Sequence, residues 1–111
     1  MNLQSCQLTK FNAKGLSSLT YLHLSDNQIT EFNGTGLSSA LTTLYLYGNP
    51  LSTVTIPESV NVQSGTWYNM IYWDLPTKSI GSPGKIYFPT GTNITAVQST
   101  LASKYWTVYW Y

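Results

Sequence analysis

Two stretches of this chain repeat each other almost residue for residue. FNAKGLSSLTYLHLSDNQIT begins at Phe11, and FNGTGLSSALTTLYLYGNPL begins at Phe32 and carries one extra residue, Ala40. The repeat therefore recurs every 21 to 22 residues. A period of this length predicts a solenoid, because each unit can bury its apolar face only against the next one. NLQSCQLTKF, near the start, reads as an earlier and partial copy.

Each copy contains the alternation of a short, half-buried strand. In LTYLHLSDN the leucines alternate with polar and aromatic residues, which turns the leucines toward the core. Asn27 follows the strand where the backbone turns inward, and its side chain can satisfy backbone groups there. In the partial copy Cys6 takes this place, and we expect a small buried residue. The residues assigned a structural role are Leu22, Leu24, Asn27, Leu44, Leu46, Asn49 and Cys6.

The repeat resembles the leucine-rich repeat family, whose pattern is L-x-x-L-x-L-x-x-N/C-x-L. The residues that meet this pattern are Leu19, Leu22, Leu24, Asn27 and Ile29, and again Leu41, Leu44, Leu46, Asn49 and Leu51. The short period and the phrase LSTVTIPESV are similar to bacterial surface repeats of the BspA-like or internalin-like type. The resemblance implies an α/β solenoid, a right-handed coil with parallel strands on its concave face. It implies binding of macromolecules through that face, and it names no ligand.

The repeat fades beyond residue 56, so we divide the chain into two parts. Residues 1–56 hold a partial repeat (1–18) and two further repeats (19–40 and 41–56). Residues 57–111 hold eleven of the sixteen aromatic residues, and large aromatic side chains can cover the core at the end of a repeat array. We therefore predict that residues 57–111 form a mixed, aromatic-rich C-terminal cap that continues the sheet.

Within this cap the sequence predicts three strands and one helix. GTWYNMIYWDL (65–75), GKIYFP (84–89) and WTVYWY (106–111) read as strands. NITAVQSTLASKY (93–105) reads as a helix with Asn93 at its N-cap, and the turn-rich PTKSIGSPGK reads as a loop.

Composition argues against several classes of function. Charged residues make up 8% of the chain, arginine is absent and the net charge is +1, so no basic surface is available for nucleic acid. No apolar run approaches the roughly 20 residues that a membrane span requires. One His, one Cys and scattered acidic residues make no metal site, and no cofactor motif is present.

A catalytic role can be weighed for His23, Ser25 and Asp26, which offer a base, a hydroxyl and a carboxylate close together in sequence. On an open strand face, however, nothing excludes water or forms an oxyanion hole. We therefore predict that the protein is not an enzyme.

The concave strand face is the predicted binding surface. Tyrosine gives a large and rigid contact area with a polar tip, although it also simply suits strands. We predict protein binding here; the alternative is an adhesin that binds carbohydrate through exposed aromatics, with Trp67, Trp73, Trp106 and Trp110 as candidates. The predicted contact residues are Tyr21, His23, Ser25, Thr43, Tyr45 and Tyr47.

The start of the chain raises a third possibility, a structural module that caps or self-assembles. The apolar residues Leu3, Leu8, Phe11 and Leu16 have no predicted cap before them, and unpaired strand edges are templates for pairing. The sequence leaves a monomer and a homo-oligomer equally open. A polar surface made of uncharged residues favours an extracellular or cell-surface location, and because the chain carries no signal peptide it would then be a mature form or a fragment.

Overall fold

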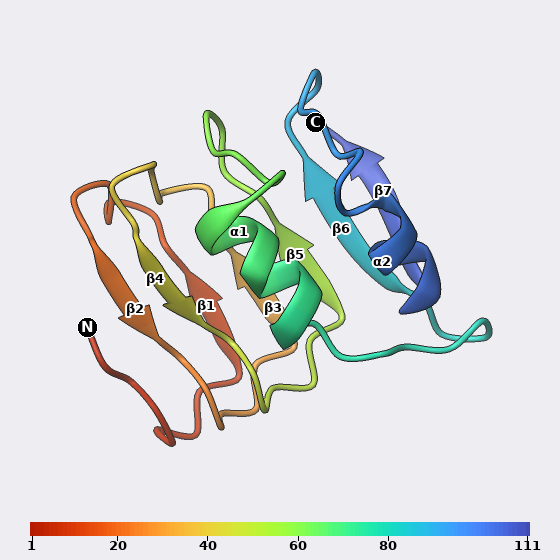
Figure 1. Ribbon diagram of the computed structural model, residues 1–111. Helices are drawn as coiled ribbons and strands as arrows, with labels where there is room; N and C mark the ends of the chain where they lie inside the picture. Colours follow the sequence, from red (N-terminus) through yellow and green to blue (C-terminus); the bar gives the residue numbers. More distant parts are fainter.

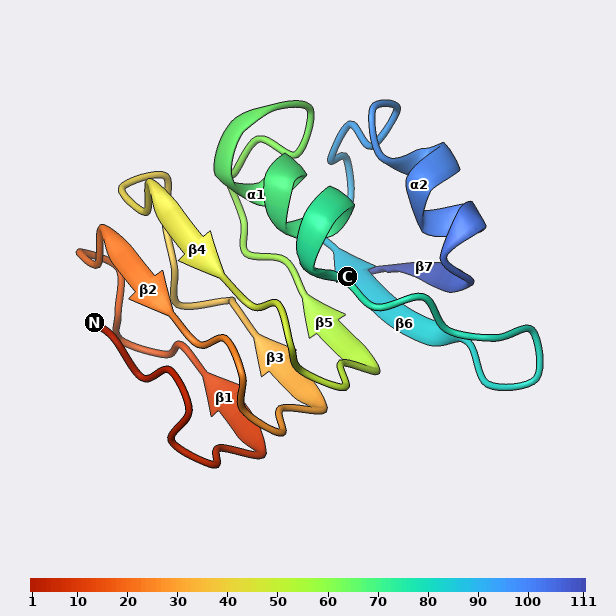
Figure 2. The same cartoon turned by 60° about the horizontal axis from the view of Figure 1, so that its bottom comes forward.

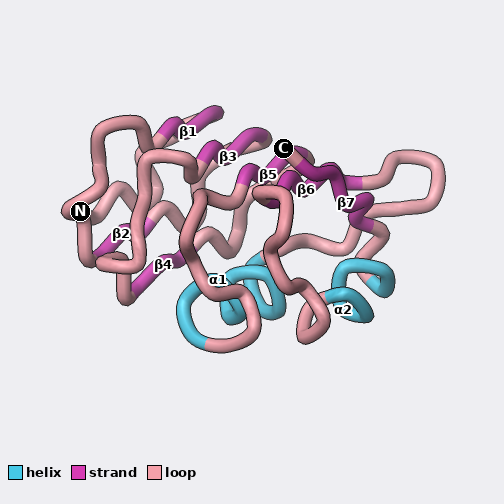
Figure 3. Tube along the Cα trace, turned by 90° about the horizontal axis from the view of Figure 1, so that it is seen from above, coloured by secondary structure: helices cyan, strands magenta, loops and turns pink.

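Two layers of secondary structure face each other in the computed structural model, which describes residues 1–111 (Figure 3). One layer is a parallel five-stranded sheet in the order β1-β3-β5-β6-β7. Its strands are β1 (Lys10–Asn12), β3 (Glu31–Asn33), β5 (Thr53–Thr55), β6 (Gly84–Phe88) and β7 (Trp106–Trp110). The other layer holds the parallel pair β2 (Tyr21–His23) and β4 (Thr43–Tyr45), and helical segments continue this layer (Figure 3).

Each full copy of the repeat gives one strand to each layer. Equivalent residues pair across the copies, as Leu22 does with Leu44 and Phe32 with Val54. The result is an α/β repeat fold in which successive copies stack in register (Figure 2). Our prediction placed strands on the concave face only and missed the second sheet. Its strands in the repeats are three residues long with one inward residue each, too short for an alternating pattern to be recognised.

One hydrophobic core fills the space between the two layers. Its largest fully buried side chains include Leu22 and Leu46 from one layer and Phe32 and Phe88 from the other. Met70, from the helical part of the chain, belongs to the same cluster of 23 buried residues. The repeats and the C-terminal part therefore bury their apolar side chains together.

Two buried asparagines join neighbouring copies of the repeat. Asn27 and Asn49 are 6% and 5% exposed and lie in the turns that follow β2 and β4. The backbone groups bonded to Asn27 are the N–H of Cys6 and Leu8 and the C=O of Leu3, Leu24 and Ser25, at 2.8–3.3 Å. Those bonded to Asn49 are the N–H of Ile29 and the C=O of Leu24 and Leu46, at 2.9–3.1 Å.

Cys6 is exposed, and our expectation of a buried residue was wrong. The side-chain oxygen of Asn27 reaches back from the next copy to the N–H of Cys6, at 2.8 Å. Asn27 thus supplies the polar interior of this turn itself, and the thiol, 3.5 Å from the carbonyl of Gln4, is left at the surface.

The segment predicted as a strand at 65–75 is helical. The helix α1 (Gly65–Asn69) continues directly into a π-helical stretch, η1 (Met70–Asp74). Its aromatic and β-branched residues suggested a strand, but the buried residues Trp67, Met70 and Ile71 recur at helical spacing. With α2 (Gln98–Ser103), the C-terminal part has two separate helical segments and not one (Figure 1).

The other C-terminal elements lie close to their predicted places, with two differences. Asn93 is not the N-cap of α2, because the helix begins later, after Val97, and Asn93 accepts the N–H of Thr95 in a local turn at 3.1 Å. β6 and β7 extend the sheet of β1, β3 and β5, and the β2–β4 pair is not extended by a third C-terminal strand.

Candidate functional site

Four aromatic side chains form one group on β2, β4 and the residues that follow β4. Strand alternation turns the leucines inward and leaves Tyr21, Tyr45 and Tyr47 38%, 41% and 43% exposed, with His23 half-buried among them. The ring of His23 lies 5.1 Å from that of Tyr45, which is 6.0 Å from that of Tyr47 and 6.5 Å from that of Tyr21. We call Tyr21, His23, Tyr45 and Tyr47 the aromatic face.

The two remaining predicted contact residues are less accessible. Thr43 is half-buried and pairs in register with Tyr21. Ser25 is fully buried and its hydroxyl has no partner, so placing it on the binding surface was wrong. Alternation determines the direction of a side chain but not its exposure. The N–H of Ser5 bonds to the carbonyl of Ser25, and the N–H of Asp26 bonds to the carbonyl of Tyr47, so neighbouring chain lies on both sides of the small Ser25.

The residues weighed for catalysis have separate partners. The Nδ1 atom of His23 lies 3.3 Å from the hydroxyl of Tyr21. The carboxylate of Asp26 accepts a hydrogen bond from the side chain of Gln4 at 3.1 Å. The buried hydroxyl of Ser25 bonds to neither, so the three residues form no hydrogen-bonded relay.

The helical segment α1–η1 lies beside β4, where a further repeat would place its strand (Figure 3). Side chains of this segment bond to the backbone of the second copy: the hydroxyl of Thr66 donates to the carbonyl of Thr42 at 3.0 Å. The carboxylate of Asp74 accepts the N–H of Leu46 at 2.8 Å. The helical segment thus satisfies edge groups that the next strand would otherwise pair with.

A hollow of about 300 Å³ lies between the aromatic face and η1. Trp73, 72% exposed, is the most exposed tryptophan of the chain and faces this hollow together with Tyr45 and Tyr47. Sequence reasoning missed Asp74, which also lines the hollow. The signal was available in the pair Trp73–Asp74 at the end of an aromatic segment, but a strand prediction for that segment hid it. The complete lining is Leu44, Tyr45, Tyr47, Asn69, Trp73 and Asp74.

Comparison of the sequence with known families gives one match. Residues 17–61 match the family of leucine-rich repeats (2 copies). This segment is therefore similar to a pair of leucine-rich repeats. It spans β2 to β5 and therefore carries the whole aromatic face. Leucine-rich repeats generally mediate recognition between proteins and are typically non-catalytic. No curated protein and no solved structure matches the chain significantly.

The charges of Asp74 and Lys104 interact near the end of η1. Burial raises the pKa of Asp74, and the bonded N–H of Leu46 and the charge of Lys104 oppose this change only in part. Burial lowers the pKa of Lys104, and the charge of Asp74 opposes that change. The ammonium group of Lys104 also donates to three backbone carbonyls at the end of η1, those of Ile71, Tyr72 and Leu75.

The raised pKa of Asp74 predicts a pH dependence of stability. A carboxyl with a higher pKa in the folded state stabilises the fold most below its ordinary value of 3.8, and this contribution is lost as the pH rises through the folded pKa. We expect the urea midpoint of the wild type, relative to that of Asp74→Asn, to fall as the pH rises from about 3.5 toward 7. Other carboxyls cancel in this comparison, and a relative midpoint that rises with pH would contradict the assignment.

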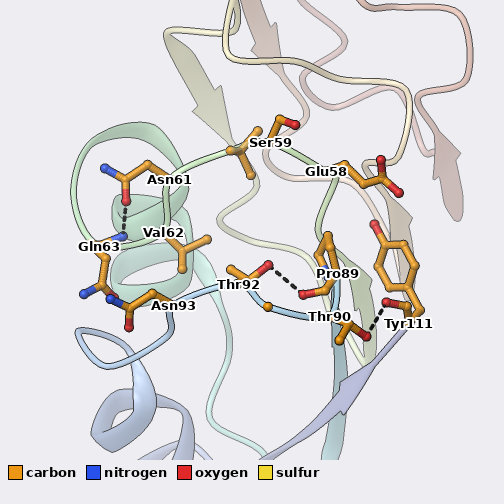
Figure 4. A pocket seen from close by; sticks show the side chains of 12 residues that line it. Glu58, Ser59, Asn61, Val62, Gln63, Pro89, Thr90, Thr92, Asn93 and Tyr111 are labelled. Atoms are coloured by element: carbon orange, nitrogen blue, oxygen red, sulfur yellow. Dashed lines mark hydrogen bonds between the residues drawn. The ribbon is translucent and has the colours of Figure 1, made fainter.

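A second and more polar hollow, of about 560 Å³, lies between the loops that follow β5 and β6 (Figure 4). Hydroxyl and amide side chains line most of it, and Glu58 is its one charged side chain. The ring of Tyr111 forms part of the wall next to Glu58, and its hydroxyl donates to the carbonyl of Ile56. Burial, and then the charge of Glu58, raise the pKa of Tyr111.

His, Cys, Asp and Glu side chains nowhere gather in a group of three that could hold a metal ion. None of the helices combines the length and the apolar character needed to cross a membrane.

Proposed function

We propose that this protein is a non-catalytic recognition module that binds a protein partner through the aromatic face. The observation that carries the proposal is the gathering of Tyr21, Tyr45 and Tyr47 around His23, with their rings 5.1–6.5 Å apart on an accessible surface. Tyrosine side chains are rigid and amphipathic, so they lose little conformational entropy on binding and dominate many interfaces. The general use of leucine-rich repeats in protein recognition supports the same proposal.

The test compares two pairs of tyrosines. Peptides selected from a displayed random library against the wild-type protein would be titrated against Tyr45→Ala/Tyr47→Ala and against the control Tyr105→Ala/Tyr109→Ala. The control tyrosines are 47% and 40% exposed but lie outside the aromatic face. We expect most peptides to lose at least tenfold in affinity with the first variant only, because central aromatic anchors typically contribute about 2 kcal/mol or more. Peptides that bind the first variant as well as the wild type would refute the proposal.

The polar hollow supports a second candidate, binding of a neutral saccharide. Its hydroxyl and amide lining and the ring of Tyr111 suit a polyhydroxylated ligand. Of the four tryptophans considered for stacking on a sugar, Trp67 and Trp106 are buried, at 3% and 5%, and only Trp73 and Trp110 are accessible. A saccharide array separates the two candidates: binding that Tyr111→Ala removes and Tyr45→Ala leaves intact would favour the saccharide.

We further propose that the protein forms a short right-handed solenoid, and that it is displayed on a bacterial surface or secreted. Stacked strands in two layers support the architecture, and the small share of charged residues supports the location. Antibody against the protein should label intact cells of the source organism or detect the protein in the culture medium, and detection only in permeabilised cells would contradict the location.

A further inference from the structure

We propose that the hollow between β4 and η1 binds a cationic side chain, lysine or arginine, of the partner protein. This inference rests on the proposed function, since it names the chemistry of one contact on the same surface. It begins from three aromatic residues and one carboxylate that line a single hollow: Tyr45, Tyr47, Trp73 and Asp74.

The aromatic walls suit a cation. The face of an aromatic ring attracts lysine, arginine and quaternary ammonium groups, most strongly on tryptophan. Trp73 is 72% exposed, so its ring is available to a partner, and the rings of Tyr45 and Tyr47 lie 6.0 Å apart at an interplanar angle of 66°. Rings at different angles around one hollow can present more than one face to the same cation. At about 300 Å³ the hollow lies at the lower limit of ligand pockets, which fits one side chain better than a whole small molecule.

The carboxylate makes the hollow complementary in charge. The Oδ2 atom of Asp74 accepts the N–H of Leu46, which holds the carboxylate in place at the edge of the hollow. Lys104, whose charge acts on Asp74, donates to three backbone carbonyls at the end of the helical segment and is not part of the lining. Asp26, whose N–H bonds to the carbonyl of Tyr47, adds a second negative charge next to the aromatic face. The one charged side chain in the lining is thus a carboxylate, with which an ammonium or guanidinium group can pair while it also contacts the rings.

Small probes test the proposal without a known partner. The whole protein would be titrated at pH 8 with the N-acetyl amides of lysine and arginine, and with those of the neutral analogues norleucine and citrulline. Amide and indole N–H shifts would be followed by NMR, because the N–H of Leu46 reports on Asp74 and the indole of Trp73 reports on the aromatic wall. We expect saturable shifts at both groups with the cationic probes, at least fivefold tighter than with the neutral ones.

Matched variants show which side chains are responsible for binding the cationic probes. Asp74→Asn keeps an acceptor for Leu46 and nearly the same shape, so it should fold and lose at least fivefold in affinity for the cationic probes. Trp73→Ala should weaken the same probes to a similar extent. Glu31→Gln removes a carboxylate that forms an exposed pair with Lys10 on the opposite sheet, and it should change nothing.

The outcomes separate this inference from the proposed function. The proposed contact with a cationic side chain is refuted if neutral and cationic probes bind equally well, or if Asp74→Asn binds the cationic probes as tightly as the wild type. If the selected peptides still depend on Tyr45 and Tyr47 in that case, recognition through the aromatic face stands and only the chemistry of this contact is refuted. If the cationic probes bind as expected while the peptides ignore those tyrosines, the hollow binds cations and the wider face does not recognise proteins.

Discussion

Replacing Asn27 with alanine will lower the free energy of unfolding by about 3 kcal/mol or more, because each buried polar group left without a partner costs about 1–3 kcal/mol. The Asn27 side chain is 6% exposed and bonds to five backbone groups of two neighbouring copies. Alanine replaces none of these bonds. Water can reach the backbone groups that lie near the surface, such as the N–H of the exposed Cys6. The loss of stability will therefore be smaller than five times the cost of one unpaired buried group.

Urea unfolding measures this loss, and the half-buried Asn33 provides the control. Asn33→Ala removes a side chain that bonds only within its own turn, to the N–H and hydroxyl of Thr35. Those groups remain accessible to water, so the control should cost less than about 1 kcal/mol. Similar midpoints for Asn27→Ala and Asn33→Ala would show that the buried asparagine does not join the copies as its geometry indicates.

Replacing Gly36 with alanine will destabilise the protein by a comparable amount, for a different reason. A Cβ atom at this position would lie 1.8 Å from the carbonyl oxygen of Ala13, an atom of the preceding copy's backbone. A side-chain end could move away, but a backbone carbonyl cannot do so unless the two stacked turns separate. Overpacking of this kind typically costs about 1–3 kcal/mol, and a clash with backbone falls at or above the upper limit.

Gly81 supplies the matched control, because a Cβ atom there meets nothing within 4 Å. Gly81→Ala should leave the urea midpoint unchanged or raise it slightly, since alanine reduces the conformational freedom of the unfolded chain. If Gly36→Ala also leaves the urea midpoint unchanged, the turns of the two copies do not approach as closely as described. If Gly36→Ala does not fold at all, that result agrees with the prediction.

The sequence predicted the features that depend on local pattern. Alternation identified the inward leucines of β2 and β4, and the position of Asn27 and Asn49 after these strands anticipated the hydrogen bonds that the structure shows. Tyr21, Tyr45 and Tyr47 could be placed on an accessible surface because strand direction follows from the same alternation. β6 and β7 carried enough alternating or β-branched residues to be recognised.

The sequence determined the repeat, its stacking and the direction of the strand side chains, because these depend on residues close together in the chain or one period apart. Only the tertiary structure decided what depends on neighbours at unrelated distances. The helical segment at 65–74 occupies the place beside β4, Ser25 is covered by adjacent chain, and Asp74 reaches the N–H of Leu46 from 28 residues away. Such contacts follow from how the elements pack in space, and no local pattern of residues records them.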